Sequence, residues 1–185
     1  MRHENTLDLS RTALAVIDVQ DSFRPHMEEF SALAARVALV VNAAQLLGVP
    51  VVVTEQYPKG LGRTAAEVRA ALPEDFEPIE KTAFSSCGAQ TFVSRLEAAG
   101  ARQVLLCGIE AHVCVNQTAH DLLALGLQVH VLTDCVSSRT RENRQVGLDK
   151  MFRSGALPSS TELALFELMR DARHEQFKAI QKLIK

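Results

Sequence analysis

A cysteine, an aspartate and a lysine in this chain have the chemistry for nucleophilic hydrolysis. Cys114 follows an apolar strand predicted at Val104–Cys107, a glycine and a short turn, and it lies at the start of a predicted helix. A helix N-terminus stabilises negative charge, so a thiol there tends toward thiolate, the form that attacks carbonyl carbons. Asp18 and Lys81 each come directly after another predicted strand. If one edge of a sheet gathers all three residues, the chain is a hydrolase.

Asp18 and Lys81 would serve the thiol in different ways. Asp18 ends an otherwise apolar strand, where a carboxylate is costly unless it is paired or functional. As a general base it would take the proton of the Cys114 thiol and return it to the leaving group. Lys81, placed between the two, would lower the pKa of each, because opposite charge favours the ionised form. Each residue also has a structural alternative. Asp18 could instead be a capping residue or the partner of a nearby arginine, and Lys81 could be a solvated surface lysine.

The other three cysteines compete with Cys114 for the role of nucleophile. Cys107 lies within a predicted strand and Cys135 follows one, so both fit the small buried residue that a free cysteine commonly is. Cys87 lies in a polar stretch, Ser85–Gly88, and is the main rival. The four cysteines form no CxxC pair and no metal-like spacing, which favours reduced thiols over a disulfide framework or a zinc site.

Strand-like and helix-like patterns alternate along the chain. Short apolar runs bounded by glycine, proline or polar residues predict strands, and longer stretches with helical spacing predict the helices between them. The predicted strands are Thr12–Ile17, Val51–Thr54, Phe76–Glu80, Val104–Cys107, Val129–Leu132 and Ala156–Pro158. The predicted helices are Phe30–Leu47, Ala65–Leu72, Gly88–Ala99, His112–Leu125, Arg141–Arg153, Ser160–Leu168 and Glu175–Ile184, with a loop at Tyr57–Arg63.

This alternation predicts an α/β fold, a Rossmann-like three-layer α/β/α sandwich around a mostly parallel six-stranded sheet. One domain is expected over residues 1–185, because no repeat or break in composition divides the chain. Functional sites of such sheets form at the carboxyl ends of the strands. Asp18, Glu55, Lys81, Gly108–Cys114 and Asp134 all follow predicted strands, so we expect them at that edge.

Composition argues against several other classes of protein. Apolar residues make up 47% and charged residues 23% of the 185 residues, an ordinary balance for a soluble globular domain. The net charge of −2 and the lack of a long basic run argue against binding to nucleic acid or a membrane surface. The apolar runs are too short for a membrane span and the first residues show no signal-peptide pattern, so we expect a cytoplasmic protein.

Three separated motifs resemble those of the isochorismatase-like cysteine hydrolases, which include nicotinamidases and carbamoylsarcosine amidases. Ala15–Phe23 resembles the segment with the family's catalytic aspartate, Glu80–Ser85 the segment with its lysine, and Gly108–Val115 the nucleophile segment. Thr54–Gly62 and the last of these motifs resemble the branch of isochorismatase domain-containing proteins and their bacterial relatives.

The resemblance implies an isochorismatase-like hydrolase fold with a catalytic triad of Asp18, Lys81 and Cys114. It also implies a cis peptide bond between Ile109 and Glu110, and an oxyanion hole made by the backbone amides of Glu110 and Cys114. The expected reaction is hydrolysis of a C–N bond in a small-molecule amide through a Cys114 thioester. Two alternatives stay open: vinyl-ether hydrolysis as in true isochorismatases, which needs no thiol nucleophile, and a non-catalytic small-molecule-binding protein on the same fold.

The sequence also departs from the nicotinamidase pattern. Nicotinamidases carry an Asp-x-His metal motif after the second strand, where this chain has Glu55–Pro58 and no histidine. We therefore predict no metal and no cofactor, and nicotinamide is a less suitable substrate. The apolar residues of Ala119–Leu125, and the assembly common among relatives, favour a homo-oligomer, a dimer or larger. Candidate residues of the substrate pocket are Phe23, Gln56, Tyr57, Phe84 and His112. Gln56, Tyr57 and Phe84 have a surface or packing role as the alternative, and His112, which we expect to line or cap the pocket at the helix start, has a metal or acid–base role as the alternative.

Overall fold

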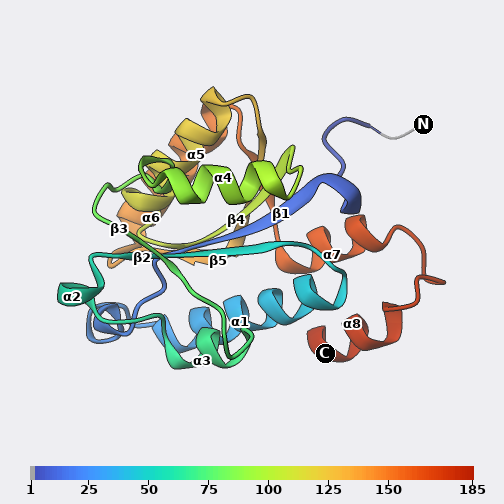
Figure 1. Ribbon diagram of the computed structural model, residues 1–185, viewed down its shortest axis with the longest axis horizontal. Helices are drawn as coiled ribbons and strands as arrows, with labels where there is room; N and C mark the ends of the chain where they lie inside the picture. The colour runs from blue at the N-terminus through green and yellow to red at the C-terminus, as the bar shows by residue number, and fades with distance from the viewer. Residues whose placement is uncertain (1–2) are drawn as a thin grey trace.

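One parallel sheet forms the centre of the computed structural model, which describes residues 3–185 (Figure 1). Its strands are β1 (Thr12–Ile17), β2 (Val51–Gln56), β3 (Ile79–Lys81), β4 (Gln103–Ile109), β5 (Gln128–Ser137) and β6 (Leu157–Ser159). Their order is β3-β2-β1-β4-β5-β6, and every neighbouring pair is parallel. The predicted α/β fold with a six-stranded sheet is confirmed.

Helices cover both faces of this sheet. In Figure 1 helices α4, α5 and α6 lie above the sheet, and α1, α3 and α8 lie below it. The α-helices are α1 (Phe30–Leu46), α2 (Pro58–Leu61), α3 (Ala66–Ala70), α4 (Gln90–Ala98), α5 (Cys114–Ala124), α6 (Arg141–Arg153), α7 (Thr161–Met169) and α8 (Phe177–Ile184). Short 3-10 helices occur at η1 (Leu9–Arg11), η2 (Asp21–His26) and η3 (Ser86–Gly88).

The largest difference from the sequence prediction is the length of β5. The apolar run stops at Leu132, yet the strand continues to Ser137 through a register shift against β4. Asp134 is tolerated inside the strand because its Oδ1 accepts a hydrogen bond from the Thr161 amide at 2.9 Å and its Oδ2 lies 3.6 Å from Arg36 Nη1. Asp134 is therefore tied to the start of α7 and to α1.

Residues 1 and 2 of the predicted domain lie outside the described part, and a single domain over residues 1–185 remains a prediction. Within residues 3–185, no helix combines the length and the apolar character that a membrane crossing requires.

The direction of the connecting segments changes between the neighbouring strands β1 and β4. The chain leaves β1 toward α1 on one face and leaves β4 toward α5 on the other, so the two connections diverge at the carboxyl ends of these strands. Ligand sites of open α/β sheets form at such a switch point. β1 lies inside the sheet between β2 and β4, and all six of its residues are buried. Asp18 follows this strand directly.

Gly108 brings the ends of β1 and β4 close together. It pairs with Ile17, the residue before Asp18, and has a φ of +127°. A Cβ at this position would lie 2.1 Å from the Ile17 carbonyl oxygen. Only glycine fits this approach, because no side chain can occupy the space of a backbone atom.

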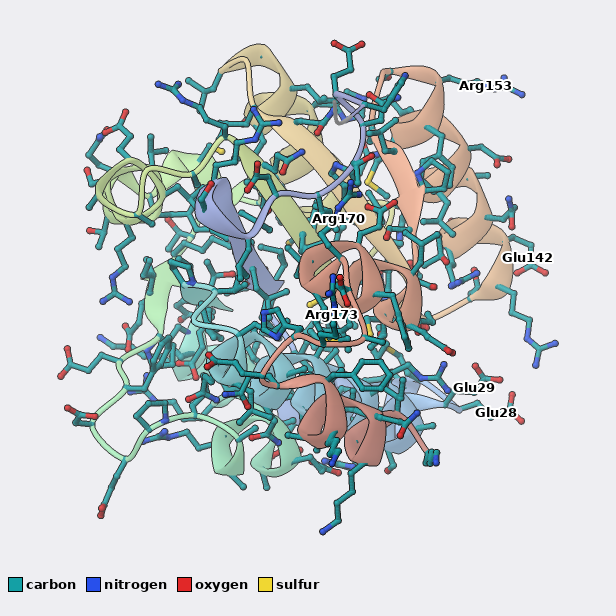
Figure 2. All side chains as sticks on the ribbon, turned by 90° about the vertical axis from the view of Figure 1, so that its right-hand side faces the viewer. Glu28, Glu29, Glu142, Arg153, Arg170 and Arg173 are labelled. Atoms are coloured by element: carbon teal, nitrogen blue, oxygen red, sulfur yellow. The ribbon has the colours of Figure 1, made fainter. Side chains whose placement is uncertain are left out.

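Helix α6 supports the segment that precedes Cys114 from the other side. Thr140 caps the helix by accepting a hydrogen bond from the Asn143 amide at 3.2 Å. Figure 2 shows Glu142 and Arg153 at opposite ends of the helix, the placement that the helix dipole favours. A Cβ on Gly147 would meet the Ala111 carbonyl oxygen at 2.6 Å, so the helix can pack directly against this backbone only through a glycine.

We expect Gly108→Ala to lower the free energy of unfolding by about 3 kcal/mol or more, since it adds a backbone clash to an unfavourable φ. Gly126→Ala is the matched control, with a φ of +79° and no atom within 4 Å of the added Cβ. That control should lose only about 1 kcal/mol, the cost of the backbone conformation alone. Urea unfolding of both variants measures the difference, and equal losses would contradict the proposed clash between β1 and β4.

Candidate active site

Asp18 lies directly beyond β1 in an unusual backbone conformation. Its φ is +52°, in the left-handed region that few residues other than glycine adopt. The Asp18 amide donates to the Thr54 carbonyl oxygen at 3.2 Å, and the Thr54 hydroxyl donates to Asp18 Oδ1 at 2.6 Å. Strained backbone held in this way is typical of functional sites.

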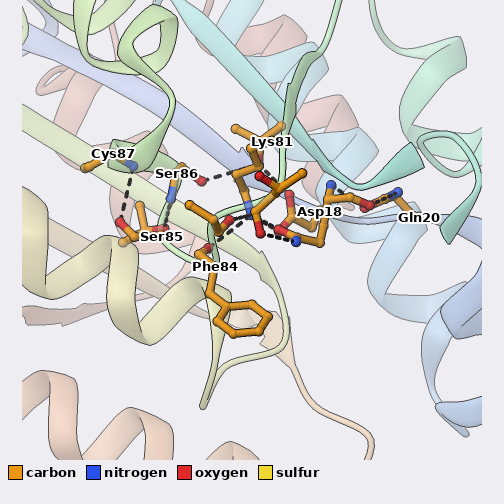
Figure 3. A network of polar contacts seen from close by, with 12 residues as sticks. Asp18, Gln20, Lys81, Phe84, Ser85, Ser86 and Cys87 are labelled. Atoms are coloured by element: carbon orange, nitrogen blue, oxygen red, sulfur yellow. Dashed lines mark hydrogen bonds and ion pairs between the residues drawn. The ribbon is translucent and has the colours of Figure 1, made fainter. Parts of the chain in front are cut away.

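Lys81 reaches Asp18 from the end of β3, two strands away in the sheet. Its Nζ donates to Asp18 Oδ2 at 2.6 Å, and both side chains are almost completely buried. The same ammonium also donates to Gln56 Oε1 at 2.7 Å and to the carbonyl oxygens of Ala83 and Phe84 at 3.2 and 3.0 Å. Figure 3 shows Lys81 at the centre of this network. The predicted pairing of Lys81 with Asp18 is thus present in the structure.

Cys114 is the first residue of α5 and lies within the electrostatic reach of both partners. It is buried, and the pKa of its thiol is raised to about 12, chiefly by that burial. The negative charge of the nearby Asp18 carboxylate contributes to this rise, whereas the positive charge of Lys81 opposes it. The structure therefore brings Asp18, Lys81 and Cys114 together at one edge of the sheet.

The direction of the Cys114 pKa differs from the sequence prediction. A helix start and a nearby lysine predict a readily ionised thiol, but the structure indicates a thiol that holds its proton. The main reason is burial, which disfavours the charged thiolate. The Asp18 carboxylate already balances the charge of Lys81, so a thiolate would add an uncompensated buried charge.

Two backbone amides, those of Glu110 and Cys114, have no hydrogen-bond acceptor among residues 3–185. The Glu110 carbonyl oxygen accepts hydrogen bonds from the amides of Val113 and Val115, at 3.0 and 3.2 Å. Within residues 3–185, the amides of Glu110 and Cys114 themselves donate no hydrogen bond. These are the two amides that the sequence assigned to an oxyanion hole.

The predicted cis peptide bond between Ile109 and Glu110 is wrong. Residues 3–185 contain no cis peptide bond. For a residue other than proline, the trans form is favoured by about 3 kcal/mol. The turn is instead held by ordinary hydrogen bonds, including that of the Ala111 amide to the Ser137 carbonyl oxygen at 2.9 Å.

His112 is engaged beside the site in a second polar cluster. Its Nδ1 lies 3.1 Å from Ser138 Oγ and 3.3 Å from Glu110 Oε2. The buried Glu110 side chain also accepts hydrogen bonds from the amide and Nε of Arg139, at 3.2 and 3.1 Å. Glu110 thereby links the segment before Cys114 to the loop after β5.

The other predicted pocket residues take different positions. Gln56 holds Lys81, and the Tyr57 amide donates to the Lys81 carbonyl oxygen at 2.8 Å. Tyr57 and Phe84 are both about half exposed, and Figure 3 shows the Phe84 ring pointing away from the ion pair. A hollow of about 420 Å³ beside Lys81 is lined in part by Tyr57. Phe23, in η2, is instead partly buried against the hydrophobic core.

The rival cysteines make other contacts. Cys107 Sγ lies 3.6 Å from the Ala15 carbonyl oxygen, and Cys135 Sγ lies 3.1 Å from Thr161 Oγ1, which are structural positions. The Cys87 amide donates to Ser85 Oγ, and Figure 3 shows Cys87 apart from the ion pair. Burial raises the pKa of the Cys87 thiol to about 11.

The residues after β2 do not fit a zinc site. Glu55 Oε1 accepts hydrogen bonds from the amide and hydroxyl of Thr64, both at 2.7 Å, and Glu55 Oε2 lies 3.0 Å from Arg63 Nη1. Its carboxylate therefore anchors the loop after α2. Among residues 3–185, no group of three or more His, Cys, Asp or Glu side chains is arranged to hold a metal ion. The expectation of a metal-free site remains a prediction.

Sequence reasoning missed two kinds of supporting residue. Gln20 is fully buried and joins the exits of β1 and β2, because its Oε1 accepts from the Gln56 amide at 2.8 Å and its Nε2 donates to the Gln56 carbonyl oxygen at 3.1 Å. Thr54 and Ser86 line up behind Asp18, with their hydroxyl oxygens 3.4 Å apart. The available signal for Thr54 is its position at the end of an apolar strand, in register with Ile17.

Several known proteins are similar to this chain in sequence and in fold. Residues 12–162 match the Isochorismatase domain. Isochorismatase domain-containing protein 2 of Homo sapiens is 45% identical over 176 residues, 94% of this chain and 83% of the human protein. The structure of MAR1 ribonuclease from Caenorhabditis elegans is 38% identical with a TM-score of 0.90, covering 97% of this chain and 92% of that one.

A more distant structure has the same architecture. The YcaC gene product of Escherichia coli, described as an octameric hydrolase of unknown specificity, is 23% identical with a TM-score of 0.90. The match covers 100% of this chain and 91% of the Escherichia coli chain. At this identity it shows the fold alone. The matched domain contains Asp18, Lys81 and Cys114, the residues that meet between β1 and β4. The chain belongs to the isochorismatase family of hydrolases.

Proposed function

We propose that this chain is a metal-independent cysteine hydrolase that cleaves the C–N bond of a small-molecule amide. Cys114 is the nucleophile, Asp18 the general base and Lys81 the charge partner of Asp18. The observation that carries the proposal is the buried Asp18 carboxylate, which binds Lys81 Nζ at 2.6 Å and lies near enough to Cys114 for its charge to raise the pKa of the thiol. A carboxylate in this position has no structural need for a thiol beside it.

The reaction begins with proton transfer from the Cys114 thiol to Asp18. The sulfur forms a bond to the substrate carbonyl carbon, and the carbonyl electron pair moves to the oxygen to give a tetrahedral oxyanion. Asp18 then gives the proton to the substrate nitrogen as the C–N bond breaks, which releases the amine and leaves a thioester on Cys114. Asp18 next takes a proton from water, and the resulting hydroxide attacks the thioester. The acid leaves as the proton returns to sulfur.

The raised pKa of the Cys114 thiol fits a coupled proton transfer. A thiol that keeps its proton at rest is protected until a substrate carbonyl can take up the developing charge. The free amides of Glu110 and Cys114 are suited to bind that oxygen, since donors fixed by the backbone need no reorganisation during the reaction. Lys81 holds the Asp18 carboxylate in place between the steps.

We propose a small molecule as the substrate, with Tyr57 as a wall residue because it lines the hollow beside Lys81. The Caenorhabditis elegans relative is named a ribonuclease. A polyanionic substrate would be unsuited to this chain, whose net charge is −2 and whose one lysine at the site is already paired. We also propose a cytoplasmic homo-oligomer, in line with the octamer described for the Escherichia coli protein; static light scattering measures the assembly.

A panel of small primary and secondary amides, ureas and carbamates, followed by release of ammonia or amine, tests the proposed reaction. We expect Cys114→Ala to lower kcat/KM by about 1,000-fold or more, because the thiol forms the covalent bond. Asp18→Asn should lower it by about 100-fold or more, the usual contribution of a general base. Cys87→Ala is the matched control and should keep the activity.

Full activity in Cys114→Ala would contradict the thioester route and favour vinyl-ether hydrolysis, which needs no thiol. Failure of the wild type to turn over any amide, urea or carbamate while binding small molecules would favour the non-catalytic alternative.

Removing the Asp18 charge should change the thiol itself. Because that carboxylate raises the pKa of Cys114 and Lys81 lowers it, Asp18→Asn should lower the pKa of the thiol by about one unit or more. At pH 8, alkylation of Cys114 by iodoacetamide should then be about tenfold faster in Asp18→Asn than in the wild type. Mass spectrometry of the Cys114 peptide measures this rate, with the Cys87 peptide as the internal reference. An unchanged rate would mean that Asp18 and Cys114 do not interact.

A further inference from the structure

A line of buried hydroxyl groups leads to Asp18 Oδ1, whereas Lys81 contacts Oδ2. Thr54 on β2, Ser86 in η3 and Thr118 on α5 are each fully buried. They come from three segments that are far apart in the sequence, and hydrogen bonds and a 3.4 Å contact between hydroxyl oxygens connect them to one another and to the Asp18 carboxylate. Thr118 lies one helical turn beyond Cys114, so the line joins the helix of the nucleophile to the strand beside the base.

The hydrogen bonds along this line have a defined direction. Thr54 Oγ1 donates its single proton to Asp18 Oδ1 at 2.6 Å. In the 3.4 Å contact between Thr54 and Ser86, the Ser86 hydroxyl must therefore be the donor. The Ser86 amide donates to Thr118 Oγ1 at 2.9 Å. Thr54 is the one hydroxyl of the three that both accepts and donates along this line, and accepting from Ser86 makes it a better donor to Asp18. The bond to Thr118 instead holds the Ser86 backbone in place.

Thr54 contacts Asp18 at both the backbone and the side chain. Its carbonyl oxygen accepts from the Asp18 amide at 3.2 Å, which holds the residue at a φ of +52°. Its hydroxyl occupies Oδ1, while Lys81 occupies Oδ2. The carboxylate plane is thus fixed from two sides, and the thiol of Cys114 approaches a base that cannot rotate.

We infer that Thr54 is a positioning residue for the proposed hydrolysis: its hydroxyl, supported by Ser86, orients the Asp18 carboxylate toward Cys114 and stabilises the charge that Asp18 carries between proton transfers. Thr54 touches neither the substrate nor the sulfur in this scheme and acts through Asp18. The inference rests on the proposed role of Asp18 as base. It adds the residue that sets the orientation and proton affinity of that base.

The test compares Thr54→Val, which keeps the shape and removes the hydroxyl, with Thr54→Ser, which keeps the hydroxyl. Each hydrogen bond to a carboxylate favours its ionised form by roughly one pH unit. In Thr54→Val we expect the carbon-13 carboxyl signal of residue 18 to titrate about one pH unit higher than in the wild type. The acid limb of the kcat/KM profile, measured with an amide from the panel, should move up by the same amount, while KM stays within about twofold.

Thr54→Ser should restore both readouts to within about 0.3 pH unit of the wild type, since it keeps the donor. Ser86→Ala should give a smaller shift in the same direction. Thr12→Val is the matched control, because Thr12 is a buried threonine at the other end of β1 whose hydroxyl donates to the Asp8 carbonyl oxygen at 2.7 Å. That variant should lose stability without moving either titration. If Thr54→Val does not fold, Thr54→Ala carries the same expectation.

The two possible failures are distinguishable. A carboxyl signal and acid limb that stay at the wild-type positions in Thr54→Val, while Asp18→Asn is inactive, would overturn the role of Thr54 and leave the proposed function intact. Full activity in Asp18→Asn or Cys114→Ala would overturn the proposed function. In that case the carbon-13 titration still decides whether Thr54 acts on Asp18.

Discussion

The buried ion pair between Asp18 and Lys81 is the interaction on which the site depends. The two side chains are only 2% and 1% exposed, and removing such charges from water costs several kcal/mol for each ion. Their attraction offsets this cost only when the remaining donors and acceptors are also satisfied. The Lys81 ammonium donates its other hydrogen bonds to Gln56 and to two loop carbonyl oxygens, and the second oxygen of Asp18 accepts one from Thr54. The loop after β3 is folded around the ammonium for this reason.

Burial and the same ion pair together keep the proton on the Cys114 thiol. Since the charges of Asp18 and Lys81 already cancel, Cys114 remains protonated in its buried position, and a thiolate there would be a third, unbalanced charge. The geometry of the fold makes this arrangement possible. Gly108 lets β4 approach the end of β1, and the connections after these two strands diverge there, as they do at the ligand sites of open α/β sheets.

Much of this arrangement is readable in the sequence. The apolar runs before Asp18 and Gly108 predict strands β1 and β4, and polar residues after parallel strands predict a site at one edge. The Cys114 pKa could not be predicted in the same way, because it depends on how deeply three distant segments are buried against one another. The carboxylate of Asp134 shows the same limit: it follows an apolar run, yet it is absorbed into β5 by contacts with the Thr161 amide and Arg36.

The supporting residues are harder still to foresee. Thr54 looks like the last member of a strand, and Gln20 like one polar residue in a motif; only the register of β1 against β2 shows what they hold. The trans bond at Glu110 is likewise a property of the folded turn, whose hydrogen bonds to Val113, Val115 and Ser137 form without a cis peptide.

The central claim is that Cys114 forms a covalent acyl intermediate with Asp18 as its base. Rapid acid quench during turnover of an active amide, followed by mass spectrometry of the Cys114 peptide, tests it most directly. We predict that this peptide gains the mass of the acyl group within the first turnover, and that the gain is absent in Cys114→Ala. Steady turnover with no acyl group on Cys114 at any quench time would contradict the account.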